Sequence, residues 1–417
     1  MAQPSGIHAR RAALQMLDAV LRRGDTLEQA EGPALRQVRS APDKALARAI
    51  VGETLRWLVD LDALIDSATR QNLPPDAKAR SVLRLMLAQK LRLGTPAHAV
   101  IATGLPLLSG GPRRLAHGVF SSLDKPDVSL PGAPTLPDAV HARWGDRAQA
   151  IAGGLAEPPP LDLTLREPED TAPWATRLGG ESLAPGHVRL PRGLAVETLE
   201  GFGTKDGGGA WWVQDLAASL PARLLGAGEG RTVLDLCAAP GGKTLQLAAQ
   251  GWKVTSLDIS KRRLGLLKDN LRRTDLSAST IRADALEWQP KHRFDAVLLD
   301  APCTATGTCR RHPDVLHRIG MRQIEETTRL QDLLLARAGA MLKPGGTLVY
   351  AVCSLESEEG EDRARGVDLA PGPIVAGELP AGLQPTPEGW LRTDPGMLRD
   401  EGGLDGFFIA RWTKDPD

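Results

Sequence analysis

The second half of the chain alternates short apolar runs with helical segments, and this alternation constrains the fold more than any other feature. Four of the apolar runs have the length of strands: Thr232–Cys237, Val254–Asp258, Phe294–Asp300 and Gly346–Ser354. Helical segments at Lys243–Gln250 and Lys261–Arg273 follow the first two runs. Strands that alternate with helices form βαβ units. We therefore predict an α/β, Rossmann-like domain with a parallel, doubly wound sheet over residues 201–417.

The first part of the chain has a helical pattern instead. Apolar side chains recur at the spacing of one helix face in two segments, at Val51, Leu55, Leu58 and Val59 and at Leu83, Met86, Leu87 and Leu91. Such stripes are typical of helices that pack on one side. The pattern predicts an all-α domain over residues 1–125, so the protein is expected to be multidomain.

A proline-rich segment separates these two parts. Residues 126–160 contain seven prolines, which favours a linker over a packed domain. Within it, Ala139–Leu155 has the character of one short helix, and Leu161–Leu165 alternates as a strand does. We predict a linker followed by a small α/β insert over residues 126–200.

Composition and charge exclude several classes of protein. The 51 Lys and Arg balance the 51 Asp and Glu, although residues 1–125 hold 18 basic and 11 acidic residues and so favour a nucleic-acid partner. The longest uncharged stretch, Leu93–Pro112, contains Pro and Gly and is not a membrane span. The first fifteen residues lack the apolar stretch of a secretion signal. Four cysteines without a CxxC pattern predict neither disulfides nor a metal site. We expect a cytoplasmic protein.

The turn after the first predicted strand, Cys237-Ala-Ala-Pro-Gly-Gly-Lys243, indicates a cofactor site. It matches neither the dinucleotide fingerprint nor the phosphate loop, but its small residues let the backbone approach a ligand at a helix start. Asp258 ends the second strand, where a carboxylate can accept both ribose hydroxyls, and Asp284 ends a further predicted strand, within reach of an adenine. This pattern fits S-adenosylmethionine, a nucleoside cofactor without a pyrophosphate. The alternative is that each Asp caps the helix that follows.

Two cysteines follow neighbouring strands of the predicted sheet. Cys303 comes after Asp300, and Cys353 ends the last run. Strand ends of this kind face the crevice where open α/β sheets bind ligands. A thiolate is a good nucleophile, and carbon 5 of cytosine becomes reactive only after a group adds to carbon 6. The pair therefore suits cytosine methylation, although spacing does not say which cysteine attacks. A lone cysteine is more often a buried apolar side chain.

Several sequence blocks resemble the Sun family of RNA 5-methylcytosine methyltransferases. They are Val233-Leu-Asp-Leu-Cys-Ala-Ala-Pro-Gly-Gly-Lys-Thr244, Asp300-Ala-Pro-Cys-Thr-Ala-Thr-Gly307, Arg310-Arg-His-Pro-Asp314, Tyr350-Ala-Val-Cys-Ser354 and Asp405-Gly-Phe-Phe408. The helical part is similar to the NusB-like domain that is fused to the RsmB (Sun, Fmu) subfamily. Three segments depart from the family pattern: Ala116–Ser122, Val352 in place of Thr, and Glu358-Glu-Gly-Glu361 in place of Glu-Glu-Asn.

The resemblance implies a role for each matching position on the cofactor side. The cofactor loop consists of Cys237, Ala238, Ala239, Pro240, Gly241, Gly242 and Lys243. Asp258 holds the ribose of S-adenosyl-L-methionine, and Asp284 lies near the adenine. Asp300 lies between the cofactor and the cytosine and bonds the edge of the base.

The resemblance also distinguishes the cysteines. It implies that Cys353 adds to carbon 6 and that Cys303 assists release of the methylated base, with Asp300 beside them. Cys309 matches no functional position of the family and is interpreted as structural.

The implied partner is RNA, and by resemblance 16S ribosomal RNA. Arg310, Arg311 and His312 directly follow the loop of Cys303 and are predicted to hold phosphates beside a target base that is splayed out of an exposed RNA segment. Lys261–Arg273 has six basic residues and one acidic, which fits either RNA binding or a solvated helix face. The alternative functions are a methyltransferase for tRNA or protein and a non-catalytic RNA-binding adaptor; Asp300, Cys303 and Cys353 argue against the adaptor.

Overall fold

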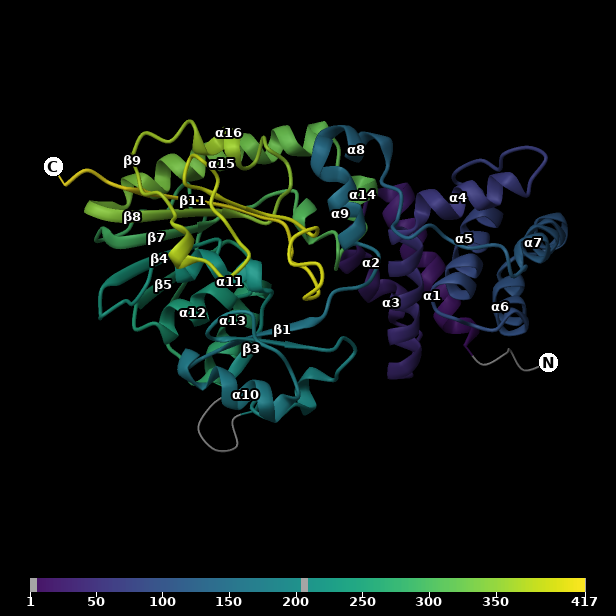
Figure 1. Cartoon of the computed structure of the whole chain (residues 1–417), viewed down its shortest axis with the longest axis horizontal. Coiled ribbons are helices and arrows are strands. Elements are labelled where there is room, and N and C mark those ends of the chain that lie inside the picture. Colours follow the sequence, from purple (N-terminus) through teal and green to yellow (C-terminus); the bar gives the residue numbers. More distant parts are fainter. Residues whose placement is uncertain (1–5, 204–208, 417) are drawn as a thin grey trace. The chain divides into compact units, whose positions relative to one another are not determined.

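The structure is a computed structural model that describes residues 6–203 and 209–416, and it divides the chain into two compact units (Figure 1). The helical unit is Met1–Glu157 with Cys309–Ile319, and the sheet unit is Pro158–Thr308 with Gly320–Asp417. The proline-rich segment is therefore shared between the units and is not a separate part. Val128 and Leu130 pack against the helical core, which draws residues 126–157 into the helical unit.

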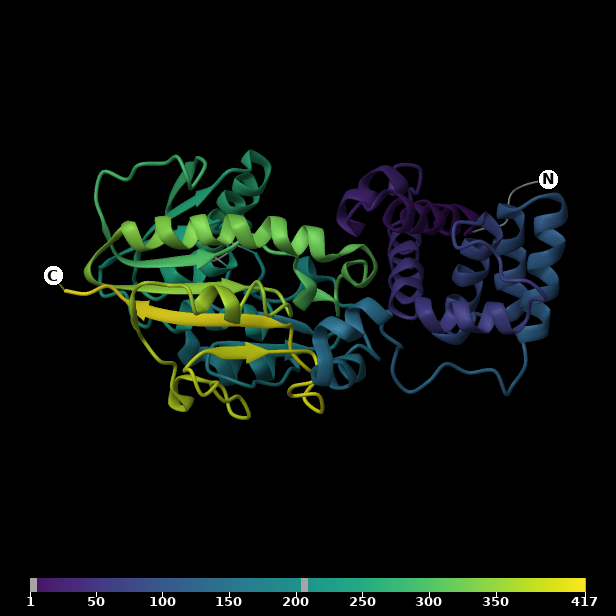
Figure 2. The ribbon, with the colours of Figure 1, turned by 90° about the horizontal axis from the view of Figure 1, so that it is seen from above.

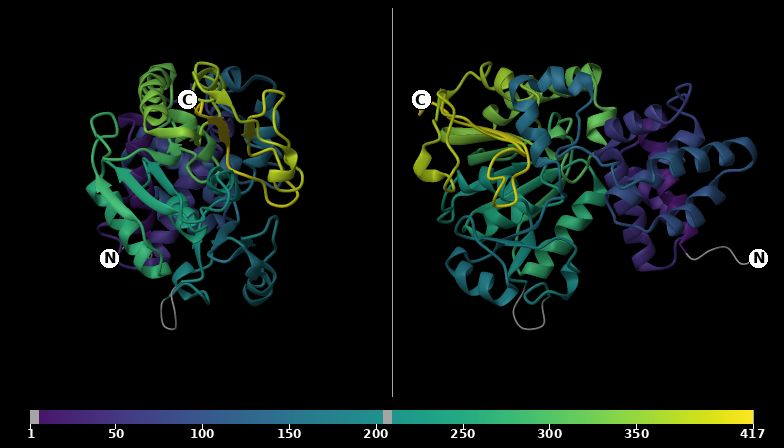
Figure 3. Two further views of the ribbon diagram at one scale, coloured as in Figure 1. Left: turned by 90° about the vertical axis from the view of Figure 1, so that its left-hand side faces the viewer. Right: turned by 45° about the vertical axis from the view of Figure 1, so that its right-hand side comes forward.

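The helical unit confirms the predicted all-α fold (Figure 3). Its helices are α1 (Ile7–Asp18), α2 (Leu27–Leu35), α3 (Ala41–Arg56), α4 (Leu58–Ser67), α5 (Lys78–Leu91), α6 (Ala97–Gly104), α7 (Gly110–Leu123), α8 (Asp138–Trp144), α9 (Ala148–Gly154) and α14 (Val315–Arg318). The predicted stripes are buried: Leu55, Leu83 and Met86 are fully inside the core. Thr26 starts α2 with a reciprocal capping box.

Two helical predictions differ in detail from the structure. The stripe at Val51–Val59 spans two helices, because Trp57 leaves helical geometry between α3 and α4. The helix predicted at Ala139–Leu155 is also two helices. Gly145 interrupts it with a positive φ of 53° that side-chain-bearing residues rarely adopt.

A three-stranded antiparallel sheet opens the sheet unit. It consists of β2 (His187–Leu190), β1 (Leu161–Leu165) and β3 (Trp211–Val213), with α10 (Thr171–Leu178) before β2. The predicted strand at Leu161–Leu165 is confirmed. Leu163, Val188 and Trp211 form its own small core.

The main sheet contains the predicted strands. Its hydrogen-bonded order is β10 (Leu391–Thr393), β11 (Phe407–Thr413), β8 (Leu342–Val352), β7 (Phe294–Asp300), β4 (Thr232–Leu236), β5 (Lys253–Asp258) and β6 (Ser279–Arg282), and β9 (Ala370–Pro371) pairs with β11. The strands β4 to β8 are parallel, as predicted. The prediction did not include the antiparallel edge of this sheet, where β11 pairs antiparallel with β8 and β10 pairs antiparallel with β11. Mixed sheets with an antiparallel edge are common in this fold class.

Helices cover both faces of this sheet. On one face, α15 (Met321–Ala340) runs along β8, and its Leu334 and Ala338 pack in one core with Val297 and Leu299 of β7 (Figure 2). On the other face, α11 (Leu216–Arg223) and α12 (Gly242–Ala249) pack against alternate residues of the same strands. The helix α13 (Lys261–Thr274) packs beside α12, and the short α16 (Glu361–Ala364) follows β8. Strands buried on both faces explain the continuous apolar runs of the sequence.

Candidate active site

The cofactor loop lies between β4 and α12, at the carboxyl edge of the sheet. Cys237 has a φ of 61° and Gly241 a φ of 110°. A Cβ on Gly241 would lie 2.8 Å from Cγ of Leu267 in α13, so only glycine fits there. The backbone N–H of Ala238 donates to the carbonyl of Leu257 at 3.1 Å, which holds the loop over the end of β5.

The two acidic residues predicted for the nucleoside lie next to this loop and at the end of β6. Asp258 is 1% exposed and accepts hydrogen bonds from the backbone N–H of Ala239 at 3.2 Å and of Ser260 at 2.8 Å. Arg263 of α13 donates to the same carboxylate at 3.2 Å. Asp284 accepts from the N–H of Leu286 at 2.9 Å. Both contacts form turns, but neither Asp caps a helix: Ser260 caps α13, and no helix lies between Asp284 and β7 in the described residues, so the capping alternative is wrong. Asp258 contacts the cofactor loop instead.

A partly buried ion pair joins the cofactor loop to the end of β7. Nζ of Lys243 donates to Oδ2 of Asp300 at 2.8 Å and lies 5.2 Å from the ring centroid of Phe407. Burial acts to lower the pKa of Lys243, but the carboxylate of Asp300 and, to a smaller extent, Cys353 raise that pKa above its ordinary value. Lys243 therefore carries a positive charge between the loop and the cysteines.

The two cysteines predicted to act together are in contact. Sγ of Cys303 lies 3.5 Å from Sγ of Cys353, and both side chains are partly buried. The hydrogen bond with Cys353 and burial raise the pKa of Cys303 well above its ordinary value. By contrast, Cys237 lies in the cofactor loop, where burial and then Asp300 raise the pKa of its thiol to about 12. Cys303 and Cys237 therefore keep their protons at neutral pH.

Sequence reasoning missed a buried residue that connects the two cysteine loops. Glu359 is fully buried, and its carboxylate accepts from Thr304, which follows Cys303, and from Ser354, which follows Cys353. In the sequence it was noted only as part of the segment Glu358-Glu-Gly-Glu361, with no role assigned to it. The match of Glu358-Glu359 to the family's Glu-Glu-Asn is the signal that could have found it.

Segments far apart in the sequence complete this part of the site. A Cβ on Gly307 would lie 1.9 Å from the carbonyl oxygen of Gly406, so the backbones of two family-like blocks touch. Arg392 of β10 bonds the carbonyl of Ser354 and pairs with Glu361. Residues 366–400, to which the sequence assigned no role, thus help to fix the loop after Cys353.

Comparisons with known proteins agree with this arrangement. Residues 222–367 match the 16S rRNA methyltransferase RsmB/F family, and residues 7–107 match the NusB family. The ribosomal RNA small subunit methyltransferase B of Klebsiella pneumoniae is 33% identical, over 98% of both chains. That of Salmonella typhi is 32% identical, over 97% of this chain and 98% of its own. The chain belongs to the RsmB family of ribosomal RNA methyltransferases.

Solved structures agree with the fold of this RsmB family member. A methyltransferase homologue from Pyrococcus horikoshii is 27% identical, with a TM-score of 0.54, over 66% of this chain and 93% of its own. The protein PH0851 has a TM-score of 0.71 at 23% identity, over 99% of both chains. The family membership makes the chain an S-adenosylmethionine-dependent ribosomal RNA methyltransferase with an N-terminal NusB domain.

The predicted RNA contacts need one correction. The segment Cys309–Ile319 belongs to the helical unit, where Arg56 donates to the carbonyl of Arg310 at 2.8 Å. The side chain of Arg310 is 2% exposed, so the prediction that it holds a phosphate is wrong for this structure. Arg311 is partly exposed and His312 is exposed. Their phosphate contacts stay predictions.

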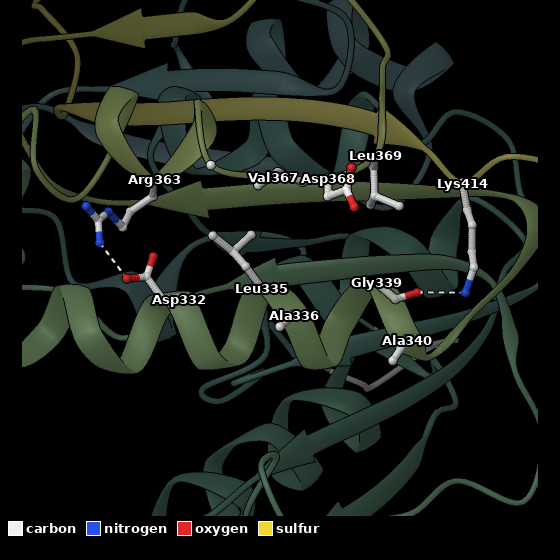
Figure 4. A pocket seen from close by; sticks show the side chains of 11 residues that line it. Asp332, Leu335, Ala336, Gly339, Ala340, Arg363, Val367, Asp368, Leu369 and Lys414 are labelled. Atoms are coloured by element: carbon white, nitrogen blue, oxygen red, sulfur yellow. Dashed lines mark hydrogen bonds and ion pairs between the residues drawn. The ribbon is translucent and has the colours of Figure 1, made fainter.

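A pocket of about 530 Å³ lies away from the cysteines. Figure 4 shows it between α15 and the segment after α16, where Lys414 bonds the carbonyl of Gly339 and Arg363 pairs with Asp332. It is distinct from the cofactor loop, and none of the predicted site residues lines it. Within residues 6–203 and 209–416, no helix is long and apolar enough to cross a membrane, and no cluster of His, Cys, Asp and Glu suits a metal ion.

Proposed function

We propose that the protein methylates carbon 5 of a cytosine in 16S ribosomal RNA through a covalent bond between Cys353 and carbon 6 of the base. The observation that carries this proposal is the contact of two thiols, Sγ to Sγ at 3.5 Å, beside the Lys243–Asp300 pair. Transfer of a methyl group to an amine, amide or carboxylate needs no covalent adduct, so a thiol pair favours a carbon of a pyrimidine. The names of the relatives favour the small-subunit RNA over tRNA. A ribosomal RNA substrate also favours the cytoplasm.

The residues of the cofactor loop fit S-adenosylmethionine. Gly241 lets the loop pack closely against Leu267 of α13, and Asp300, Asp258 and Asp235 all act on the loop electrostatically. Oδ1 of Asp235 has no hydrogen-bond partner among the described residues, although the residue is fully buried. An acidic, small-residue cradle suits a cofactor with an ammonium and a sulfonium group. Residues 237–243 and Asp258 would hold it, with Asp284 toward the adenine. The bound cofactor supplies the methyl group.

The residues of this chain then divide the work on the base. The thiolate of Cys353 forms a bond to carbon 6, which makes carbon 5 electron-rich enough to accept the methyl group. Asp300, held by Lys243, bonds the edge of the cytosine. The proton on carbon 5 then passes to water, the electron pair of that C–H bond restores the double bond between carbons 5 and 6, and the bond from carbon 6 to Cys353 breaks to return the thiolate. Cys303, which keeps its proton in the resting site, is next to the reacting sulfur and assists this release.

Nucleoside mass spectrometry tests the proposal directly. Unmodified 16S ribosomal RNA is incubated with S-adenosylmethionine and either the wild-type chain or Cys353→Ala. We expect new 5-methylcytidine with the wild type only. Methylation of another base would refute the cytosine assignment, and 5-methylcytidine in tRNA alone would refute the substrate. A product formed equally by Cys353→Ala would refute the covalent route.

A further inference from the structure

We propose that Glu359 is a positioning residue that fixes the separation of Cys303 and Cys353, so that one thiol can attack while the other assists release. This inference rests on the proposed function. Glu359 comes six residues after Cys353, between β8 and α16, and its side chain is fully buried. It contacts neither sulfur, so its effect is through the residues that follow each cysteine.

One carboxylate holds both cysteine loops. Oε1 of Glu359 accepts the backbone N–H of Thr304 at 2.9 Å, and Oε2 accepts the hydroxyl of Thr304. Oε2 also accepts the hydroxyl of Ser354. Thr304 is bonded in sequence to Cys303, and Ser354 to Cys353. Each cysteine is therefore followed directly by a residue that is hydrogen-bonded to the carboxylate of Glu359.

The helix α15 supplies the frame for this carboxylate. The hydroxyl of Thr327 donates to Oε1 at 2.6 Å, and Nε2 of Gln331, one helical turn further, donates to it at 3.2 Å. Nε2 of Gln331 also donates to the carbonyl of Pro302 at 2.9 Å. The loop of Cys303 is thus held on both sides, at Pro302 and at Thr304. A 20-residue helix in the core is a rigid reference for both loops.

The hydrogen-bond pattern suits a carboxylate at this position. Five hydrogen bonds reach the two carboxylate oxygens of Glu359, from one backbone N–H, one amide and three hydroxyls, and none of these groups is charged. A carboxylate accepts at Oε2 from the hydroxyls of Thr304 and Ser354, whereas an amide nitrogen there would turn its hydrogens toward them and force both hydroxyls to accept. Burial of such a group without full satisfaction is costly, so Glu359→Gln should displace one or both loops.

The charge of Glu359, like its hydrogen bonds, distinguishes the two cysteines. It lies on the side of Cys303, where it adds to the effects of Cys353 and of burial in raising the pKa of that thiol. The positive charge of Lys243 lies on the side of Cys353. The two thiols are therefore in contact, with a negative charge acting on Cys303 and a positive charge near Cys353. Loss of Glu359 would remove the negative charge and release both cysteine loops.

An arsenical probe measures the separation of the sulfurs without RNA. Phenylarsine oxide condenses with two thiols, forming two As–S bonds and releasing one water, and the product holds two sulfurs at about the van der Waals separation found here. The full chain and its variants are loaded with phenylarsine oxide, and mass spectrometry follows its removal by increasing 2,3-dimercaptopropanol. We expect Glu359→Gln to lose the arsenical at a lower competitor concentration than the wild type. Cys303→Ala should not retain it.

Glu358→Gln is the matched control, because this neighbouring carboxyl group is partly exposed and, within the described residues, accepts one hydrogen bond, from the hydroxyl of Ser357 at 3.4 Å. It should behave as the wild type. Equal retention in Glu359→Gln and Glu358→Gln would overturn the proposal. If Glu359→Gln does not fold, Thr327→Val removes one donor from α15 and leaves both cysteine loops intact in sequence; it should show a smaller shift in the same direction, and no shift would overturn the proposal.

Methylation kinetics then separate positioning from a merely structural role. We expect Glu359→Gln to lower kcat about 10–100-fold, as the loss of a group that orients active-site residues does elsewhere, with KM for RNA and the affinity for S-adenosylmethionine unchanged. Glu359→Asp should recover part of the rate. A fall in cofactor affinity equal to the fall in kcat would indicate general unfolding and overturn the proposal. If the wild type makes no 5-methylcytidine, the proposed function fails, while the arsenical result still decides whether Glu359 fixes the thiols.

Discussion

The carboxyl edge of the main sheet has two halves that are built in different ways. The cofactor half, residues 237–243 with Asp258 and Asp284, is shaped by backbone: small residues, left-handed φ angles and N–H groups that bond carboxylates. The cysteine half, Cys303 and Cys353 with the residues around Glu359, is held by side chains from segments up to about ninety residues apart. The residues of the first half all lie in one continuous part of the sequence, 237–284. The second half forms only when side chains from several separate segments are correctly placed at the same time.

The largest effect should come from the cysteine half, through its two thiols. Cys353→Ala should lower methyl transfer by roughly 10⁴-fold or more, because the covalent step is lost. Cys303→Ala should instead accumulate a protein–RNA adduct, because release is slowed while attack is retained. Denaturing gels of each variant with 16S ribosomal RNA and S-adenosylmethionine check this. An adduct with Cys353→Ala and none with Cys303→Ala would reverse the two roles.

The same contrast explains how much the sequence could predict. The cofactor loop, Asp258 and the strands before them are contiguous, so their pattern predicted the fold, the cofactor and the edge of the sheet. The contact of Cys303 with Cys353 needed only parallel topology and was also predictable. The role of Glu359 was not, because its partners on α15 are about thirty residues away, and its match to the family's Glu-Glu-Asn says nothing of burial or of hydrogen-bond partners. Nor was the burial of Arg310, which depends on its segment joining the helical unit.

On the cofactor side, the buried Asp235 should make stability depend on pH. Burial, opposed in part by the hydroxyl of Thr244 and assisted by Asp300, raises the pKa of Asp235 from 3.8 to about 7. The folded chain therefore takes up a proton that the unfolded chain releases, and stability should fall as pH rises from about 4 to 7. Asp235→Asn should remove this dependence. For a pKa shift of this size, the dependence amounts to up to about 4 kcal/mol in the free energy of unfolding.

Urea unfolding of the wild type and Asp235→Asn at pH 4, 5.5 and 7 measures this difference, with Asp269→Asn on the exposed surface of α13 as the control. Parallel pH profiles for the wild type and Asp235→Asn would show that folding leaves the pKa of Asp235 unchanged.

Backbone contact is not confined to the cofactor half, and Gly307 tests how far the cysteine half depends on it. Gly307→Ala places a methyl group 1.9 Å from the carbonyl oxygen of Gly406, so the two loops must separate. We expect a loss of about 1–3 kcal/mol in the free energy of unfolding. Gly265→Ala is the matched control, because that glycine lies in α13 with nothing within 4 Å of its Cβ position. Equal stability of the two variants would show that the loops are free to move apart.

The variant Asp258→Asn should have a smaller effect, and it tests whether Asp258 binds the cofactor or only holds the turn before α13. Asp258→Asn keeps an oxygen for the N–H of Ser260 but removes one acceptor and the charge that faces Arg263. If Asp258 holds the ribose, the affinity for S-adenosylmethionine should fall about tenfold with little change in melting temperature. Isothermal titration calorimetry and thermal unfolding together decide this. A lower melting temperature at unchanged affinity would show that Asp258 stabilises the loop and does not bind the cofactor.

The smallest expected effect concerns Cys309–Ile319, the segment that follows the loop of Cys303 and belongs to the helical unit. Arg311 is partly exposed, whereas its neighbour Arg310 is buried. If Arg311 holds one phosphate, Arg311→Ala should flatten the dependence of log K on log salt by about 0.7, the value for one contact to single-stranded RNA. The exposed Arg322 of α15, paired with Glu326, gives the control Arg322→Ala. An unchanged slope for Arg311→Ala would remove this segment from the RNA interface, and electrostatic contact with RNA would then have to come from other surfaces, such as the basic face of α13.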